Sequence, residues 1–299
     1  MCVEDPLRAA LNAVDASVLS LADDNYPPLL REIPDPPPLL YARGDLSLLR
    51  EPQLAIVGAR SATVAGLKLA EQIAATVVEA GLHICSGLAR GVDGAAHRGA
   101  LRGGGKTVAV MASGIDILYP ARHRALGEDI CRAGCLITEF PPGVTPRPEF
   151  FPRRNRIISG MSLGTLVVEA ALPSGSLITA QTALEQGREV FALPWSPAHK
   201  GGAGCLKLLR DGAKMVTRVD DILEELGALH GLQLDLLQQA EAGTTTRSAV
   251  LDLLGCEVVT LDGLIEASGS PAAEVVAELS RLELGGHIER SAGGYIRVV

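Results

Sequence analysis

Aromatic and basic side chains gather in one short segment near the middle of the chain. Residues 150–156 read Phe-Phe-Pro-Arg-Arg-Asn-Arg, so two aromatic rings stand beside three arginines and one asparagine. Aromatic faces stack nucleobases, arginines neutralise phosphates, and an asparagine amide bonds a base edge. A hydrophobic plug before a basic helix start is the alternative, but positive charge at a helix N-terminus opposes the helix dipole. The segment therefore favours binding of single-stranded nucleic acid.

Turns rich in glycine and other small residues follow several apolar runs. They cover residues 58–66, 86–94, 113–116 and 173–176. Small residues let backbone amides approach an anion, and the start of a following helix favours negative charge. Arg60, in the first of these turns, adds a planar fork of donors. The turns are therefore candidate cradles for phosphate.

Two titratable residues accompany the second of these turns. Asp93 is placed to cap the following helix or to act in the site, and the two roles are about equally supported. His97 falls one turn into that helix without a serine or cysteine partner nearby in sequence. A lone histidine of this kind is more often structural.

Nucleotide-hydrolysing motifs do not fit this chain. The run Gly103–Thr107 ends like a P-loop, but Ala100 stands where that motif needs its first glycine, and Lys106 opens a strand rather than a helix. The first small-residue turn is not GxGxxG, so dinucleotide binding has little support. We expect no catalytic residue, no cofactor and no metal site.

Short apolar runs alternate with helical patterns through the middle of the chain. Because this alternation is typical of a doubly wound, mostly parallel sheet, we predict an extended Rossmann-like α/β domain. The expected strands are 54–57, 82–85, 107–112, 135–139, 163–168 and 189–193. The expected helices are 67–80, 94–101, 122–133, 156–161 and 176–186, with a long loop from Phe140 to Arg154. Ligands of such sheets bind beyond the carboxyl ends of the strands, where the small-residue turns lie.

The chain divides into four parts on this interpretation. Residues 1–50 form an N-terminal helical stub and a proline-rich strap, and residues 51–226 form the Rossmann-like domain. Residues 227–243 are a polar, glutamine-rich linker. Residues 244–299 read as three helices and a glycine-tipped hairpin, which predicts a small winged-helix domain.

Charge is distributed unevenly along the 299 residues. The net charge is −8, yet the stretch from Arg90 to Arg156 holds eleven basic and six acidic residues, which leaves +5. The overall balance argues against nonspecific coating of nucleic acid, while the central stretch suits local binding. The six cysteines form no CxxC pair and fit buried thiols in a reducing compartment. Without a signal or a spanning apolar run, the sequence predicts a cytoplasmic protein without membrane contact.

Together these turns resemble the DprA (Smf) family of DNA-processing proteins. The resemblance runs from about Asp23 to Leu226. It is carried by Gly58-Ala59-Arg60, Ser86-Gly87-Leu88-Ala89-Arg90-Gly91-Val92-Asp93, Gly114-Ile115-Asp116 with Tyr119-Pro120, Phe151-Pro152-Arg153-Arg154-Asn155-Arg156-Ile157-Ile158-Ser159-Gly160, and Ser174-Gly175-Ser176-Leu177-Ile178-Thr179-Ala180.

The resemblance implies a protein that binds single-stranded DNA, forms a homodimer through the Rossmann domain and loads RecA recombinase during natural transformation. It implies that arginines hold phosphates, that Phe151 and Asn155 contact bases, and that the 174–176 turn lines the same pocket. The DNA-binding residues expected on this basis are Gly58, Arg60, Ser61, Ser86, Gly87, Arg90, Gly91, Gly114, Phe151, Arg153, Arg154, Asn155, Arg156, Ser174, Gly175 and Ser176.

The chain departs from the family pattern at both ends. Only a stub precedes Asp23, where members often carry a larger helical domain. From Thr244 onward four arginines stand against eight acidic residues, which gives −4. An acidic recognition helix repels duplex phosphates, so we expect this module to contact protein instead. Tight binding of duplex DNA by residues 244–299 would contradict that expectation.

An enzyme is the alternative interpretation. The predicted fold also resembles nucleotide-cleaving phosphoribohydrolases of the lysine-decarboxylase-like group, which carry a PGGxGT turn. Here the corresponding turn is Pro173–Ser176 and its glycine pair is missing. Glu169 is a candidate acid, but no partner carboxylate or nucleophile is evident. A third alternative, a duplex-binding regulator, is disfavoured by the acidic winged helix.

Overall fold

The chain divides into two compact units, Met1–Leu229 and His230–Val299. A computed structural model describes residues 6–227, 253–254, 258–272, 275–276, 279, 282, 288–291 and 293–297. The expected linker at 227–243 and most of the expected helix at 247–254 lie outside these residues.

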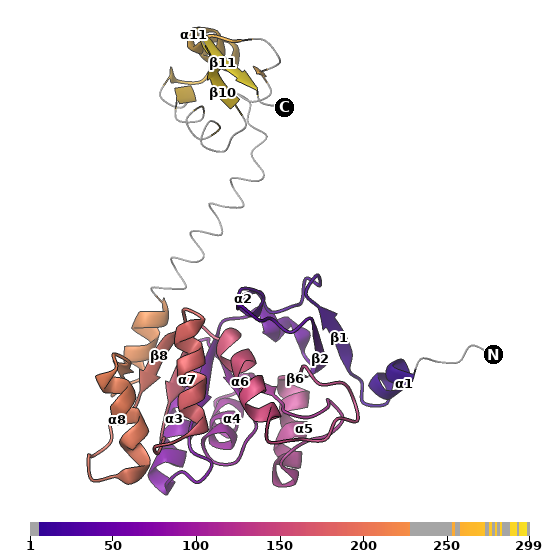
Figure 1. The fold of residues 1–299 in the computed structure, drawn as a ribbon, viewed down its shortest axis with the longest axis vertical. Helices are drawn as coiled ribbons and strands as arrows, with labels where there is room; N and C mark the ends of the chain where they lie inside the picture. The colour runs from indigo at the N-terminus through magenta and orange to yellow at the C-terminus, as the bar shows by residue number, and fades with distance from the viewer. Residues whose placement is uncertain are drawn as a thin grey trace, which may run out of the picture. The chain divides into compact units, whose positions relative to one another are not determined.

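A nine-stranded sheet forms the centre of the first unit, in the order β1-β2-β6-β5-β4-β3-β7-β8-β9 (Figure 1). Strands β3 to β9 run parallel to one another, whereas β2 pairs antiparallel with both β6 and β1. This confirms the predicted Rossmann-like, mostly parallel architecture. The strands are β1 (Ser17–Ser20), β2 (Leu39–Gly44), β3 (Gln53–Val57), β4 (His83–Ser86), β5 (Thr107–Val110), β6 (Cys135–Thr138), β7 (Gly164–Val167), β8 (Glu189–Ala192) and β9 (Lys214–Met215).

Helices cover both faces of this sheet. Residues of α3 and α4 pack with Leu54 and Ile56 on one face, and residues of α6, α7 and α8 pack with Ala55 and Val57 on the other. Successive residues of β3 therefore point to opposite faces, and both faces are buried. The helices of the first unit are α1 (Pro6–Asn12), α2 (Pro28–Arg31), α3 (Val64–Glu79), α4 (Val92–Arg102), α5 (Arg124–Ala133), α6 (Phe150–Gly160), α7 (Gly175–Glu185) and α8 (Ala203–Arg210), with short 3-10 helices at η1 (Leu46–Arg50), η2 (Ala121–His123) and η3 (Lys200–Gly202).

The strand order reverses between β3 and β7. From β3 the chain proceeds through β4 and β5 to β6, and after α6 it returns to β7 on the other side of β3. The loops that leave β3 and β7 therefore diverge, and the carboxyl ends of these strands border a crevice. In open α/β sheets, ligands bind at this topological switch point.

The N-terminal segment differs from the expected stub and strap. Instead of lying on the domain as an extended strap, residues 39–44 pair with β6, and residues 17–20 pair with 39–42. Leu40, Tyr41 and Ala42 are buried in this arrangement. The proline clusters exclude a long helix, as predicted, but the apolar run after them is long enough to extend the sheet.

Helix α6 begins earlier than the sequence indicated. The segment from 150 to 155, expected at the end of a loop, forms the first turns of α6. Pro152 is compatible with this position because the first turn of a helix contains backbone N–H groups without an intrahelical partner. The aromatic and basic residues of this segment are therefore held on a helix.

The second unit shows the elements of a winged helix. Helix α11 (Leu261–Ser268) is capped by Thr260, whose side chain accepts a hydrogen bond from the Gly263 amide, and ends at Gly269. Strands β10 (Ile288–Ser291) and β11 (Gly294–Arg297) form the predicted antiparallel hairpin. A small core of Leu254, Leu264, Val275, Leu279, Leu282 and Ile288 holds the described part together.

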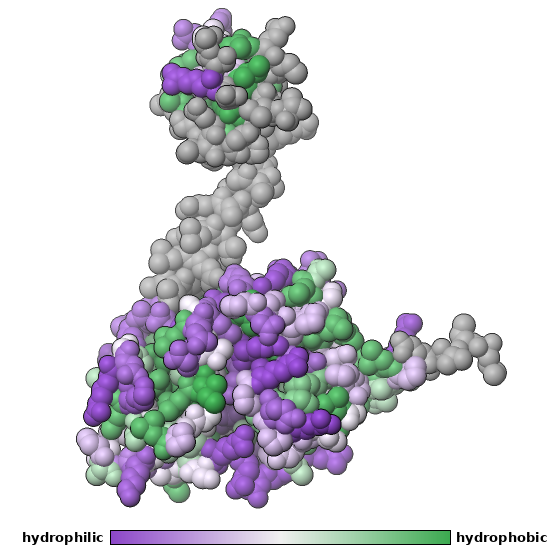
Figure 2. Space-filling view, viewed as in Figure 1, coloured by the Kyte–Doolittle hydropathy of each residue, from purple (hydrophilic) through white to green (hydrophobic). Residues whose placement is uncertain are grey.

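Hydrophilic side chains spread over the visible face of the first unit, with separate hydrophobic patches between them (Figure 2). Among the helices that the structure describes, none combines the length and apolar character needed to cross a bilayer.

A buried histidine joins α4 to the sheet. The Nδ1 atom of His97 lies 2.8 Å from the hydroxyl of Thr107, and that hydroxyl donates to the carbonyl of Ile84 at 2.7 Å. The hydroxyl proton is thereby used, so Nδ1 of His97 donates. Burial lowers the pKa of His97 from 6.5 to about 3, so the imidazole is neutral, and the positive charges of Arg154 and Arg98 act in the same direction. His97 therefore has the structural role that its isolation in sequence favoured.

The buried neutral histidine predicts a loss of stability in acid. Between pH 6.5 and 3 the unfolded chain binds a proton at His97 that the folded chain does not. The contribution of His97 to the free energy of unfolding is therefore fully present above pH 6.5 and decreases as the pH falls. The slope approaches about 1.4 kcal/mol per pH unit. Chemical denaturation of wild type and His97→Gln between pH 7 and pH 5 measures this slope. The free energy of unfolding of the variant should depend less steeply on pH by that amount. Equal slopes for the two proteins would contradict a buried, neutral His97.

Candidate nucleic-acid interface

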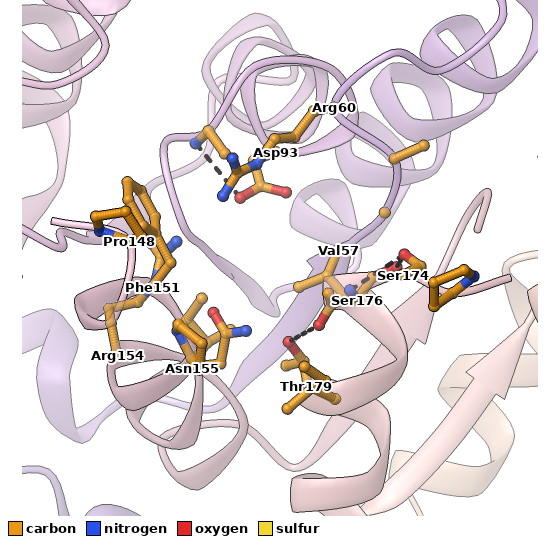
Figure 3. A pocket seen from close by; sticks show the side chains of 18 of the residues that line it. Val57, Arg60, Asp93, Pro148, Phe151, Arg154, Asn155, Ser174, Ser176 and Thr179 are labelled. Atoms are coloured by element: carbon orange, nitrogen blue, oxygen red, sulfur yellow. Dashed lines mark hydrogen bonds between the residues drawn. The ribbon is translucent and has the colours of Figure 1, made fainter. Parts of the chain in front are cut away.

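A cavity of about 770 Å³ opens at the reversal of strand order. Its walls come from the loop after β3, the start of α6, and the turn between β7 and α7. We call it the switch-point cavity. Figure 3 shows Phe151, Arg154 and Asn155 from α6 facing Ser174, Ser176 and Thr179, with Arg60 and Asp93 at a third side.

Aromatic and cationic side chains are combined at one wall. The guanidinium of Arg60 lies over the ring of Phe151, 4.8 Å from its centroid. The Tyr119 ring approaches the same phenylalanine at a centroid distance of 6.0 Å and is half-exposed. These contacts place a cation for phosphate beside aromatic surfaces for bases.

Two adjacent phenylalanines have different roles. The ring of Phe150 stacks on that of Phe140, with centroids 4.3 Å apart, whereas Phe151 lines the cavity. Neighbouring residues of a helix point about 100° apart, so one packs inward while the other faces the opening. Phe150 therefore has the packing role that the sequence offered as an alternative for the two aromatic residues.

Hydroxyl groups occupy the opposite wall. Ser174 caps α7, and its Oγ accepts a hydrogen bond from the amide of Ser176 at 3.3 Å. The two serine hydroxyls lie 2.7 Å apart. Thr179 lies one turn further along the same helix and also lines the cavity. A helix N-terminus with several small hydroxyl side chains is suited to a phosphate oxygen.

The buried Arg154 forms the floor of the cavity. Its side chain is 3% exposed, and Nη1 donates to the carbonyls of Gly87, at 2.6 Å, and Val110. Burial lowers the pKa of this guanidinium, and the nearby charge of Asp93 acts in the opposite direction. Burial likewise raises the pKa of Asp93, against the effect of Arg154. The two groups therefore offset part of each other's desolvation cost.

Nine of the residues expected from sequence line this cavity together. They are Gly58, Arg60, Ser61, Phe151, Arg154, Asn155, Ser174, Gly175 and Ser176. Arg90 and Gly91 line a second cavity, which shares Arg60 and Ser61 with the first. The structure thus brings most of the expected set to one edge of the sheet.

Three further expected residues support the loops without lining either cavity. The buried Ser86 donates its hydroxyl to the carbonyl of Ile56 at 2.6 Å. A Cβ atom at Gly87 would lie 2.3 Å from the guanidinium of Arg154, so only glycine allows that close approach. The amide of Gly114 donates to the carbonyl of Val144 at 2.8 Å. We interpret them as structural residues.

Arg153 and Arg156 are paired with an acidic residue instead of lining the cavity. Both guanidinium groups lie within ion-pair distance of the Glu139 carboxylate, at 2.9 and 2.7 Å. That carboxylate is almost fully buried, so it needs a compensating positive charge. Arg156 also lies 3.4 Å from Asp35. The sequence could not reveal this pairing because the acidic partners lie far away along the chain.

Several residues of the cavity were absent from the expected binding set. Tyr119 belongs to a motif that carried the family resemblance, and Arg147 lies in the basic central stretch. Asp93 and Thr179 also line the cavity. The sequence around these residues does not indicate which way their side chains point.

Glu169, the candidate acid of the enzymatic alternative, is engaged elsewhere. Its Oε2 accepts hydrogen bonds from the amide and hydroxyl of Thr63 at 3.0 and 2.9 Å, and Oε1 lies 3.0 Å from Nε2 of His199. The carboxylate is buried and does not line the switch-point cavity. Through these hydrogen bonds, Glu169 connects the start of α3 to the end of β7. Within the described ranges, no group of three or more His, Cys, Asp or Glu residues is placed to hold a metal.

Comparisons with known proteins show the family of the chain. The family model for DNA recombination-mediator protein A matches residues 17–227, and the model for the DprA winged helix domain matches residues 236–294. Protein Smf of Escherichia coli is 43% identical over 281 residues, covering 91% of this chain and 75% of that protein. DNA processing protein DprA of Streptococcus pneumoniae is 45% identical over 206 residues, covering 69% of this chain and 73% of that protein.

Two solved structures share the fold. The X-ray structure of DprA from Streptococcus pneumoniae aligns with a TM-score of 0.69 at 43% identity, covering 73% of this chain and 77% of the other. DNA processing protein A of Helicobacter pylori aligns with a TM-score of 0.64 at 28% identity, covering 71% and 95%. The structure of that protein is described for its single-stranded DNA binding mode.

Proposed function

Because the chain belongs to the family of DNA recombination-mediator protein A, we propose that it binds single-stranded DNA in the switch-point cavity. The observation that carries this proposal is the stacking of Arg60 over Phe151 at the mouth of the cavity. The pair places a cation for a phosphate and an aromatic face for a base close enough for a single nucleotide to contact both. The strand-binding mode described for the Helicobacter pylori relative supports it.

Each wall has a distinct task in this proposal. Arg60 and Arg147 bind phosphates, since neither forms an ion pair among the described residues. Phe151 and Tyr119 stack bases, and Asn155 bonds a base edge. The capped turn at Ser174 receives a further phosphate. The buried Arg154 positions the loops through its hydrogen bonds to the carbonyls of Gly87 and Val110, and does not contact a phosphate of the strand.

Removing the exposed arginine tests the proposal. Arg60→Ala should weaken binding of a labelled dT oligonucleotide and lower the salt slope by about 0.7 per lost phosphate contact. Titrations across a salt series, with duplex of equal length for comparison, measure both effects. Arg210→Ala removes an exposed arginine on α8 outside the cavity and should leave the slope intact. An unchanged slope in Arg60→Ala would remove this residue from the site.

Truncating the stacking ring gives a second test. Phe151→Ala should cost about 1–3 kcal/mol of dT binding because a base loses its aromatic platform, and Phe151→Trp should retain affinity. Phe150→Ala is the matched control on the neighbouring residue. It removes the stack on Phe140 and the ring that contacts Arg147, so it should reduce thermal stability and cost less dT affinity than Phe151→Ala. Equal affinity losses in the two alanine variants would indicate a general effect on α6.

We further propose that the bound strand is handed to RecA recombinase during natural transformation, by a cytoplasmic homodimer that contacts itself through the first unit. The name of the matching family, a recombination mediator, supports this step. The acidic winged helix is proposed to contact protein rather than duplex DNA, since residues 244–299 carry four arginines against eight acidic residues.

Delivery of the strand is measurable in a coupled assay. Wild-type protein should accelerate the DNA-dependent ATPase activity of RecA on single strands coated with a single-strand-binding protein. Arg60→Ala should lose this effect in proportion to its loss of strand binding. Normal strand binding without acceleration would restrict the function to strand binding and contradict the loading step.

A further inference from the structure

A second cavity of about 350 Å³ adjoins the switch-point cavity. Arg60 and Ser61 line both, so the two spaces meet at the loop after β3. The far side of the second cavity is formed by Arg90, before α4, and by Arg122 and His123 of η2. We call it the η2 cavity.

Positive charge predominates in the lining of the η2 cavity, although the Asp93 carboxylate in the adjoining cavity interacts electrostatically with Arg60. Arg60, Arg90 and Arg122 are all exposed, and none of them forms an ion pair among the residues the structure describes. No aspartate or glutamate belongs to the lining. Three guanidinium groups around one space repel each other unless an anion lies between them. The lining therefore favours an anionic occupant.

The walls of this cavity are fixed by contacts with the backbone. His123 lies with Nδ1 2.9 Å from the carbonyl of Leu88, so this nitrogen donates. Its ring packs over α4 so closely that a Cβ atom at Gly94 would lie 2.5 Å from Cε1. Gly91 has a φ of 79°, and a Cβ atom there would lie 2.1 Å from the carbonyl oxygen of Ala59. The arginines thus project from a rigid base.

The composition of the lining identifies the kind of anion. The η2 cavity contains no phenylalanine, tyrosine or tryptophan, in contrast to the switch-point cavity with Phe151 and Tyr119. It can neutralise phosphate, and the aromatic ring in its lining, the imidazole of His123, is held against Gly94 and hydrogen-bonded to the carbonyl of Leu88. We propose that the η2 cavity binds a backbone phosphate of the strand whose bases occupy the switch-point cavity, which sets the path of the strand past Arg60 towards η2. This inference rests on the proposed strand binding.

A length series of dT oligonucleotides tests the inference. For the shortest oligonucleotide that wild type binds, Arg122→Ala and Arg90→Ala should retain wild-type affinity. For longer oligonucleotides, each variant should bind about tenfold more weakly, as expected for one lost charge-assisted contact. The salt slope should fall by about 0.7 on the long strand only. Arg122→Lys should recover most of the slope, and Arg210→Ala should match wild type at every length.

The possible results distinguish failure of the η2 inference from failure of the proposed strand binding. If both variants bind long strands with wild-type affinity and slope while Arg60→Ala weakens binding, the η2 inference fails and strand binding stands. If wild type binds no strand of any length, both fail. Equal weakening at all lengths would assign the arginines to the switch-point cavity and overturn a separate phosphate position. Loss of inorganic-phosphate binding in Arg122→Ala, with long-strand binding unchanged, would assign the cavity to free phosphate and also overturn it. Melting temperatures of the variants should equal that of wild type, since both side chains are exposed.

Discussion

The buried guanidinium of Arg154 connects the parts on which the site depends. It extends from α6 to the carbonyls of Gly87, after β4, and Val110, at the end of β5. A charge in this position costs several kcal/mol unless it is compensated, and the two carbonyls at Nη1 and the charge of Asp93 provide that compensation, although Nε has no hydrogen-bond partner among the described residues. These contacts favour the observed position of α6. With α6 held there, Phe151 on the same helix faces the carboxyl ends of the strands. The position of the binding wall thus follows from satisfying a buried charge.

The sheet supplies the second half of this arrangement. Reversal of strand order between β3 and β7 leaves two diverging loops, and each carries small residues at a helix start. Thr63 and Ser174 cap α3 and α7, and Glu169 fastens the first of these loops to β7. Cations and aromatic rings stand on one side of the cavity, with hydroxyls on the other. A strand with alternating phosphates and bases is complementary to such a surface.

Much of this architecture could be predicted from the sequence, and the failures have identifiable causes. Buried parallel strands appear as short apolar runs, so β3 to β8 and the small-residue turns after them were predictable. The start of α6 was missed because Pro152 resembles a loop residue, although a first helical turn tolerates it. The pairing of Arg156 with Glu139 joins residues on two elements, and no local pattern encodes it. The different roles of Phe150 and Phe151 depend on the direction of each side chain on α6. The sequence does not show this difference, because the two residues are of the same type and adjacent.

Photo-crosslinking of a bromodeoxyuridine-substituted single strand to the full chain, followed by peptide mapping, tests the central claim most directly. A base stacked in the switch-point cavity lies against Phe151 and Tyr119, so the account predicts crosslinked peptides that contain one or both of these residues. These crosslinks should weaken in Arg60→Ala at a strand concentration that just saturates wild type. Crosslinks confined to residues 230–299, or to the first unit outside the loops after β3, β5, β6 and β7, would contradict it.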